Sequence, residues 1–127
     1  LLVPPGSSQL MVVESLGRRI TTYEIADDGS LFDPAVWADL QPNVPSGACP
    51  DGHHGVWATD PVNKGVMRVI AQVGAVEWIS TGDRRAYACA LGGEDGNVLF
   101  VCTGLTSEPR QAAERRVGRV ELAVVDT

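Results

Sequence analysis

Short apolar runs separated by turn-forming residues follow one another along the chain. Three of the runs resemble one another and start 45 and then 43 residues apart; they occupy residues 10–15, 55–60 and 98–103. Each run follows a turn signal rich in glycine, serine, aspartate or asparagine. The β-branched and aromatic residues of these runs favour strands. The pattern therefore predicts a strand-rich unit that repeats about every 44 residues.

Further apolar segments complete each unit. A second segment follows each run, at 19–25, 66–70 and 118–125. Two units add a third segment, at 35–39 and 75–79. A strand also precedes each turn, at 1–3, 46–49 and 87–91. Propeller blades have this length and about four short strands. A β-sandwich also has short strands, but it would not be expected to repeat one order of segments three times. We therefore expect an all-β fold with about three four-stranded blades of a β-propeller, at residues 1–42, 43–81 and 82–127.

One segment has the composition of a helix. Residues 108–116 contain Gln-Ala-Ala-Glu-Arg-Arg, which are good helix formers, and Pro109 stands in the first turn. Ser107 precedes them and is the expected N-cap. We interpret this segment as a short surface helix inserted in the last blade.

Three blades do not close a ring, because known propellers have about 4–8. An open arc leaves two sheet faces and unpaired edges exposed. Two explanations remain. The chain could be the C-terminal half of a longer polypeptide, which is the preferred interpretation, or two copies could close a six-bladed ring. The expected partner is thus the missing half of the propeller or a second copy of this chain.

Charge excludes some classes of partner. The net charge is −6, and the chain shows no basic patch of the kind that nucleic-acid binders carry. Binding to DNA or to an anionic membrane is therefore not expected. No apolar run approaches the roughly 18 residues needed to span a bilayer.

The three cysteines are Cys49, Cys89 and Cys102. An odd number at these spacings fits neither a zinc module nor a disulfide scaffold. We interpret them as small buried residues in a reducing compartment, and we expect a cytoplasmic protein. Cys89 and Cys102 could face each other across a hairpin, which leaves a disulfide between them as an alternative.

Several segments, taken in order, resemble the second half of the gluconolactonase/regucalcin family. The middle unit carries Val-Pro-Ser-Gly-Ala-Cys-Pro-Asp-Gly at 44–52, Val-Trp-Ala-Thr-Asp at 56–60 and Asn-Lys at 63–64. The stretch 87–103, with a Cys-containing strand, Gly-Gly and an apolar Phe-Val strand, is similar to the family's last blade. Val-Gly-Arg-Val-Glu at 117–121 resembles its closing strand, and Glu-Ser at 14–15 before Arg-Ile-Thr-Thr-Tyr resembles its fourth blade. The resemblance covers nearly the whole chain.

The resemblance implies a six-bladed propeller with a divalent metal, calcium or zinc, near its central axis. The family's ligands are a Glu of the first blade, an Asn, and the Asp of a Pro-Asp-Gly motif. The first two positions lie outside this chain, and Ser46 stands at the Asp position. A hydroxyl can contact a hard cation but brings no charge. Ser46 is therefore the one candidate metal ligand, and a turn residue in a site that has lost its metal is the alternative.

Other candidate residues are weaker. Arg84 and Arg85 lead into the last blade, where a guanidinium could bind a sugar hydroxyl or carboxylate, although a solvated loop is the competing interpretation. His53 and His54 follow Asp51-Gly52 in a turn and have no zinc-like spacing to other ligands. Asp51 is interpreted as a turn residue that bonds its own backbone.

The resemblance implies a function for the complete ring. It would be a metal-dependent hydrolase that opens a sugar lactone, or a similar cyclic ester, by metal-assisted attack of water. This chain alone would not be active. The alternatives are a non-catalytic propeller that binds a small molecule or a protein, and a half-propeller that self-assembles.

Overall fold

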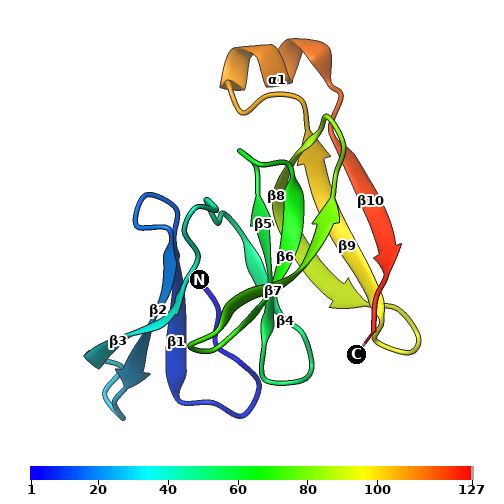
Figure 1. The fold of residues 1–127 in the computed structure, drawn as a ribbon. Coiled ribbons are helices and arrows are strands. Elements are labelled where there is room, and N and C mark those ends of the chain that lie inside the picture. The colour runs from blue at the N-terminus through cyan, green and yellow to red at the C-terminus, as the bar shows by residue number, and fades with distance from the viewer. Residues whose placement is uncertain (127) are drawn as a thin grey trace.

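The computed structural model describes residues 1–126, and these residues form three antiparallel sheets and one helix (Figure 1). The sheets have the orders β1-β2-β3, β4-β5-β6-β7 and β8-β9-β10. Their strands are β1 (Gln9–Glu14), β2 (Arg19–Ile25), β3 (Leu31–Asp39), β4 (Ala48–Pro50), β5 (Val56–Asp60), β6 (Gly65–Ile70), β7 (Gly74–Ser80), β8 (Arg85–Gly92), β9 (Val98–Gly104) and β10 (Arg119–Val124). The all-β prediction is confirmed.

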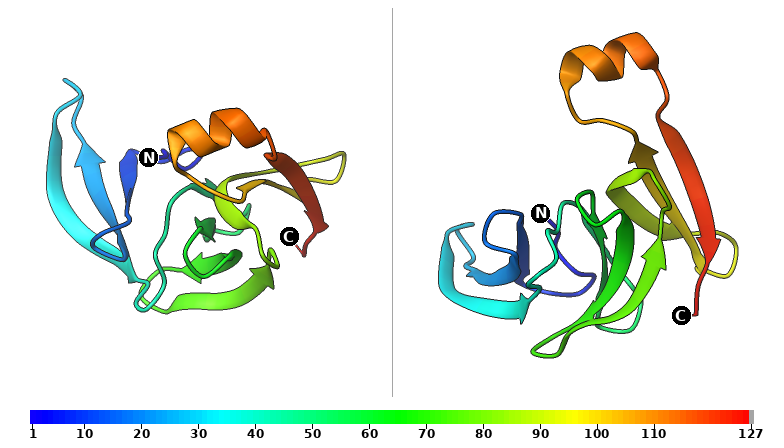
Figure 2. Two further views of the ribbon diagram at one scale, coloured as in Figure 1. Left: turned by 90° about the horizontal axis from the view of Figure 1, so that it is seen from above. Right: turned by 45° about the horizontal axis from the view of Figure 1, so that its top comes forward.

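The three sheets stand next to one another in chain order, and from above they follow an open arc (Figure 2). Each sheet lies within one of the ranges 1–42, 43–81 and 82–127. The second sheet has the four strands expected, whereas the first and third have three. In the first sheet, the backbone of Leu2 exchanges hydrogen bonds of 3.0 and 2.8 Å with Met11. This short bridge takes the place of an innermost strand beside β1.

Two apolar cores hold adjacent sheets together. Met11 and Ile20 of the first sheet pack with Val56, Met67 and Val69 of the second, and the partly buried Trp37 packs against them. These positions alternate along their strands, so each sheet turns one row of side chains toward its neighbour. The first core therefore fixes the position of the first sheet on the second.

The second core joins the second and third sheets. Trp57 is only 1% exposed and lies with Val66, Ala86, Leu99 and Val101. The three tryptophans fall in segments expected to be strands, which predicts that they pack between blades, and Trp57 agrees with this prediction. Trp78 differs, because its indole is 43% exposed and covers Gly65 of its own sheet. The prediction was wrong for Trp78 because β7 is the outer strand of its sheet.

The outer face of the third sheet is apolar and uncovered within residues 1–126. Alternate residues of β9 and β10 point to this face, and Phe100, Val120, Leu122 and Val124 are 36%, 63%, 63% and 79% exposed. Val120 pairs with Cys102, and Leu122 pairs with Phe100, so these side chains form adjacent rows. Contiguous apolar surface of this kind marks an interaction site.

The helix α1 (Pro109–Arg115) lies in the connection between β9 and β10 and projects from one end of the third sheet (Figure 1). Its residues are exposed, as expected of a surface insertion. The N-cap is Glu108 and not Ser107. The Glu108 carboxylate accepts hydrogen bonds from the backbone N–H groups of Arg110 and Gln111, at 3.1 and 2.7 Å. Glu108 thus satisfies two of the donors that a helix start leaves unpaired.

Candidate functional site

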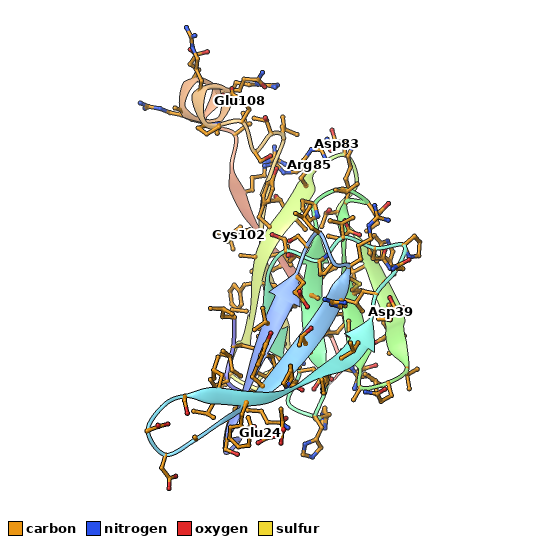
Figure 3. The ribbon with its side chains drawn as sticks, turned by 90° about the vertical axis from the view of Figure 1, so that its left-hand side faces the viewer. Glu24, Asp39, Asp83, Arg85, Cys102 and Glu108 are labelled. Atoms are coloured by element: carbon orange, nitrogen blue, oxygen red, sulfur yellow. The ribbon has the colours of Figure 1, made fainter. Side chains whose placement is uncertain are left out.

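Two of the three predicted site residues lie at the same end of the second and third sheets. Ser46 lies two residues before the inner strand β4, and its backbone N–H donates to the Thr59 carbonyl at 2.8 Å. Arg85 opens β8, and its Nη1 donates to the Pro61 carbonyl at 2.9 Å. Ser46 and Arg85 therefore flank one short stretch of backbone at the end of β5. Figure 3 shows Arg85 at this end, near Asp83, with Glu24 at the opposite end.

The local structure around Ser46 is fixed on both sides. The Ser15 hydroxyl donates to the Pro45 carbonyl at 2.6 Å, and the Gly47 N–H donates to the Thr59 hydroxyl at 2.9 Å. Pro45 is buried, whereas Ser46 is exposed. The chain thus presents the Ser46 side chain to solvent from a rigid backbone.

The carboxylates that end the equivalent strands β5 and β1 are already bound. Asp60 is fully buried and accepts hydrogen bonds from the N–H groups of Val44, Val62 and Asn63 at 3.0, 2.9 and 2.9 Å, and from Asn63 Nδ2 at 2.7 Å. An Asp at the end of a strand that collects several N–H groups in this way fixes the following turn. Asp60 therefore has a structural role.

Glu14, at the end of β1, is held by its own sheet. Its carboxylate accepts from Arg19 Nε at 2.8 Å and from the Thr21 hydroxyl. The hydrogen bond from Arg19, and next that from Thr21, lower the pKa of Glu14 below its usual value. Glu14 is thus an ionised partner of Arg19 on the first sheet.

The described residues do not by themselves fit a divalent metal. Across residues 1–126 no three His, Cys, Asp or Glu side chains come together as a ligand set. Ser46 offers one neutral oxygen, and a Ca²⁺ site takes about 6–8 oxygen ligands, several of them charged. A metal beside Ser46 would need carboxylate ligands from outside this chain.

Arg84 is deeply buried, with 6% of its surface exposed. Its Nε donates to the Thr103 hydroxyl at 2.9 Å, and its Nη2 donates to the Thr103 carbonyl at 3.3 Å and to the Val117 carbonyl. Glu121 lies 4.0 Å from its Nε. The Arg84 guanidinium therefore ties both ends of the segment that carries α1 to the start of the third sheet.

Asp51 forms a buried ion pair that the sequence did not reveal. Its carboxylate accepts from the N–H groups of His53 and Gly55 at 2.7 and 2.9 Å, as expected of an Asp-centred turn, and also from Arg68 Nε at 2.9 Å. Burial raises the pKa of Asp51, but the His53 N–H, the Arg68 guanidinium and the Gly55 N–H together bring it below its usual value. His53 and His54 are exposed in this turn.

A cavity of about 500 Å³ lies between the first and second sheets, away from Ser46. Its lining includes residues 4–7, Met11, Trp37, His54 and Val56. The Asp51–Gly55 turn that carries His54 is at the far end of β4 from Ser46. No motif pointed to this cavity, because its walls come from three separate segments that meet only in the folded chain.

The structure does not bring together Cys89 and Cys102, the pair that the sequence left as a possible disulfide. All three are free thiols. Cys102 is exposed and faces Ala88 across the hairpin, so a disulfide to Cys89 is excluded by the strand register. Cys89 instead points toward the second sheet, where its Sγ lies 3.6 Å from Cys49 Sγ. The prediction of burial was wrong for Cys102, because it lies on the uncovered face of the third sheet.

No helix among residues 1–126 has the length and apolar character needed to cross a bilayer.

Comparisons with known proteins agree with the fold. The chain is similar in structure to luciferin-regenerating enzyme, with a TM-score of 0.73 and 16% identity over 94% of this chain and 41% of that one. It is also similar to regucalcin from Agrobacterium tumefaciens strain C58, described as a calcium-binding protein, with a TM-score of 0.71 and 14% identity over 94% of this chain and 42% of that one. The chain thus spans about two fifths of the length of these β-propeller structures.

Sequence comparison gives the family. No curated protein matches the chain. The model of the SMP-30/gluconolactonase/LRE-like region matches residues 2–104, which include all of the first two sheets and most of the third. This chain therefore belongs to the SMP-30/gluconolactonase/LRE-like family.

Proposed function

We propose that this chain is part of a metal-dependent hydrolase that opens a sugar lactone or a similar cyclic ester. The family match over residues 2–104 carries the proposal. The exposed hydroxyl of Ser46, which stands at the family's Asp ligand position and lies two residues before the inner strand β4, supports it. Lactones are uncharged esters, so their binding does not require a basic patch, in keeping with the net charge of −6.

In this proposal the site is shared with the rest of the ring. The metal, calcium or zinc, would be held mainly by carboxylate and amide oxygens from the rest of the ring. Ser46 would contribute a hydroxyl to the metal or to the substrate. Arg85, which is half-buried and donates to the Pro61 carbonyl two residues beyond the carbonyl that Ser46 binds, would bind a hydroxyl or carboxylate of the sugar. The buried Arg84 would hold Arg85 and the start of β8 in position.

The uncovered face of the third sheet would pack against the blade that completes the ring. That blade would come from a longer polypeptide, or else from a second copy of this chain. We also place the protein in the cytoplasm, since three free thiols suit a reducing compartment.

A non-catalytic propeller that binds a small molecule or a protein is the second candidate. The neutral side chain at position 46 favours it, because a calcium or zinc site without this carboxylate has lower affinity. In that case Ser46 and Arg85 would contact a ligand without any reaction. The two candidates differ in whether lactone hydrolysis depends on a divalent metal.

The test combines a rate and a binding measurement on the native protein. We expect the protein to hydrolyse a six-membered sugar lactone, with the rate measured as proton release. A chelator should stop this hydrolysis, and added Ca²⁺ or Zn²⁺ should restore it. Ser46→Asp should tighten metal binding in calorimetry by about tenfold, because it adds a charged ligand. Ser8→Asp is the matched control, since Ser8 is exposed beside the end of β2 that lies farthest from this site.

Two results would contradict the proposal. The absence of metal-dependent hydrolysis with a panel of lactones would favour the non-catalytic propeller. Equal metal affinities for Ser46→Asp, Ser8→Asp and the unmodified protein would show that position 46 is not at a metal site.

A further inference from the structure

Two sulfur atoms meet where the innermost strands of the second and third sheets come together. Cys49 lies in the middle of β4 and Cys89 in β8, 40 residues further along the chain. Their Sγ atoms are 3.6 Å apart. Cys89 Sγ also lies 3.4 Å from the Trp57 carbonyl, on the strand next to β4. Both side chains lie in or against the second core, where the two thiols contact each other.

The backbone holds the two strands close together at this point. Gly47 precedes Cys49 by two residues, and a Cβ at Gly47 would lie 2.8 Å from the Tyr87 carbonyl oxygen and 3.0 Å from Ala88 Cα. Only a glycine permits so close an approach. The chain segments are therefore in contact two residues before the two cysteines, and the sulfurs are brought together by the fold. A disulfide has an S–S distance of about 2.05 Å, so the two side chains must move about 1.5 Å closer.

The two thiols are chemically unequal. The hydrogen bond between the two sulfurs lowers the pKa of Cys49 despite burial, and a backbone hydrogen bond with Leu91 adds to this effect. The same hydrogen bond, followed by burial, raises the pKa of Cys89. Cys49 is thus the thiol more readily ionised, and thiolates are the nucleophiles in cysteine oxidation. Cys102 is exposed on the opposite face of the third sheet and takes no part.

We propose that Cys49 and Cys89 form a reversible disulfide that fastens the second sheet to the third at their inner strands, with a peroxide as the oxidant. The Cys49 thiolate attacks one peroxide oxygen, the O–O bond breaks, and Cys49 becomes a sulfenic acid while hydroxide leaves. The Cys89 sulfur then attacks the Cys49 sulfur, the S–O bond breaks, and water leaves. Two thiols and one hydrogen peroxide thus give one disulfide and two waters, with two electrons passing to the peroxide. A small dithiol reverses the reaction by exchange.

This inference goes beyond the proposed lactonase function and does not depend on it. The bridge would close a loop of about 40 residues and restrict the unfolded chain, so it would stabilise the contact between two blades. Because exchange with a small dithiol would reopen the bridge, it would form and break with the redox state of the surroundings.

The test is peptide mapping of the native protein after treatment with hydrogen peroxide and alkylation of the remaining thiols. Trypsin leaves Cys49 in the peptide 20–64, but Cys89 and Cys102 both in 86–110. The Cys102→Ala variant removes this ambiguity and keeps both proposed partners. We expect it to give a cross-link between the two peptides, and an unfolding midpoint raised on the order of 10 °C that a dithiol returns to its starting value.

Cys89→Ala is the matched variant, chosen because Cys89 is only half-buried, whereas Cys49 is buried and its replacement could impair folding. It should give neither the cross-link nor the rise in midpoint. The proposal is overturned if peroxide-treated Cys102→Ala contains no cross-link, or if Cys49 and Cys89 accumulate as separate sulfinic acids. It is also overturned if Cys89→Ala shows the same shift in midpoint.

Discussion

Replacing Gly47 with alanine would place a methyl group where the inner strands of the second and third sheets touch. The new Cβ would lie 2.8 Å from the Tyr87 carbonyl oxygen and 3.0 Å from Ala88 Cα. Well-packed carbon atoms are separated by about 3.5–4.0 Å, so a gap of at least about 0.5 Å would have to open. Both contacts are backbone atoms, and Ala88 is paired with Cys102 in the β8–β9 hairpin. No flexible side chain can move aside to accommodate the methyl group.

The expected loss of stability follows from two opposing terms. Forcing an extra methylene-sized group into a packed region costs about 1–3 kcal/mol. Alanine also restricts the unfolded chain more than glycine does, which stabilises the folded state by about 0.4–1 kcal/mol. We therefore expect Gly47→Ala to lower the free energy of unfolding by about 1–2 kcal/mol. The loss should come from separation of the second and third sheets.

Urea unfolding of the native protein, followed by tryptophan fluorescence, measures this difference. The urea midpoint should fall, and the slope should stay the same. Gly118→Ala is the matched control, because a Cβ there would lie 3.8 Å from its nearest contact, the Thr103 carbonyl oxygen. It should leave stability within about 0.5 kcal/mol of the unmodified protein. If Gly47→Ala unfolds at the same urea concentration as this control, the close contact between the two inner strands is wrong.

Two further substitutions test the buried polar groups. Asp51→Asn should lower the free energy of unfolding by about 1–3 kcal/mol at neutral pH, because it weakens the bond to Arg68. Because the pKa of Asp51 is depressed in the folded protein, its carboxylate stabilises the fold above the unfolded pKa of about 3.9, and this stabilisation is lost as the pH falls through the folded pKa. In that acidic range the urea midpoint of Asp51→Asn should therefore fall less than that of the unmodified protein. Equal falls for the two proteins would contradict this role of Asp51. Arg84→Met should destabilise by about 1–3 kcal/mol, because it leaves the Thr103 and Val117 carbonyls without their donor. An unchanged urea midpoint with a raised KM would instead assign Arg84 to substrate binding.

The repeating sheets could be predicted from sequence because their signal is local. Alternation of apolar and polar residues defines each strand, and the turn signals define where strands end, so three units were visible at 1–42, 43–81 and 82–127. The helix was visible for the same reason. Its cap was not, because Ser107 and Glu108 both have a side-chain oxygen, and only the backbone geometry decides that Glu108 reaches the free N–H groups.

The contacts between sheets could not be predicted from sequence. Asp51 and Arg68 are 17 residues apart, and Cys49 and Cys89 are 40 apart, so their approach depends on how strands pair and how sheets pack. The sequence offered Cys102 as a partner for Cys89 because a hairpin joins them. The register places Cys102 opposite Ala88, and the alternation of side chains then turns Cys89 to the other face.

We infer that this chain supplies three blades of a closed ring, in which a further blade covers the apolar face of the third sheet. Light scattering on a sizing column, combined with mass spectrometry under denaturing conditions, gives the native mass and the chains that compose it. We predict a native particle larger than this 13.5 kDa chain, made of two copies or of a polypeptide that contributes the remaining blades. A stable, folded particle of 13.5 kDa that contains only this chain would contradict the claim.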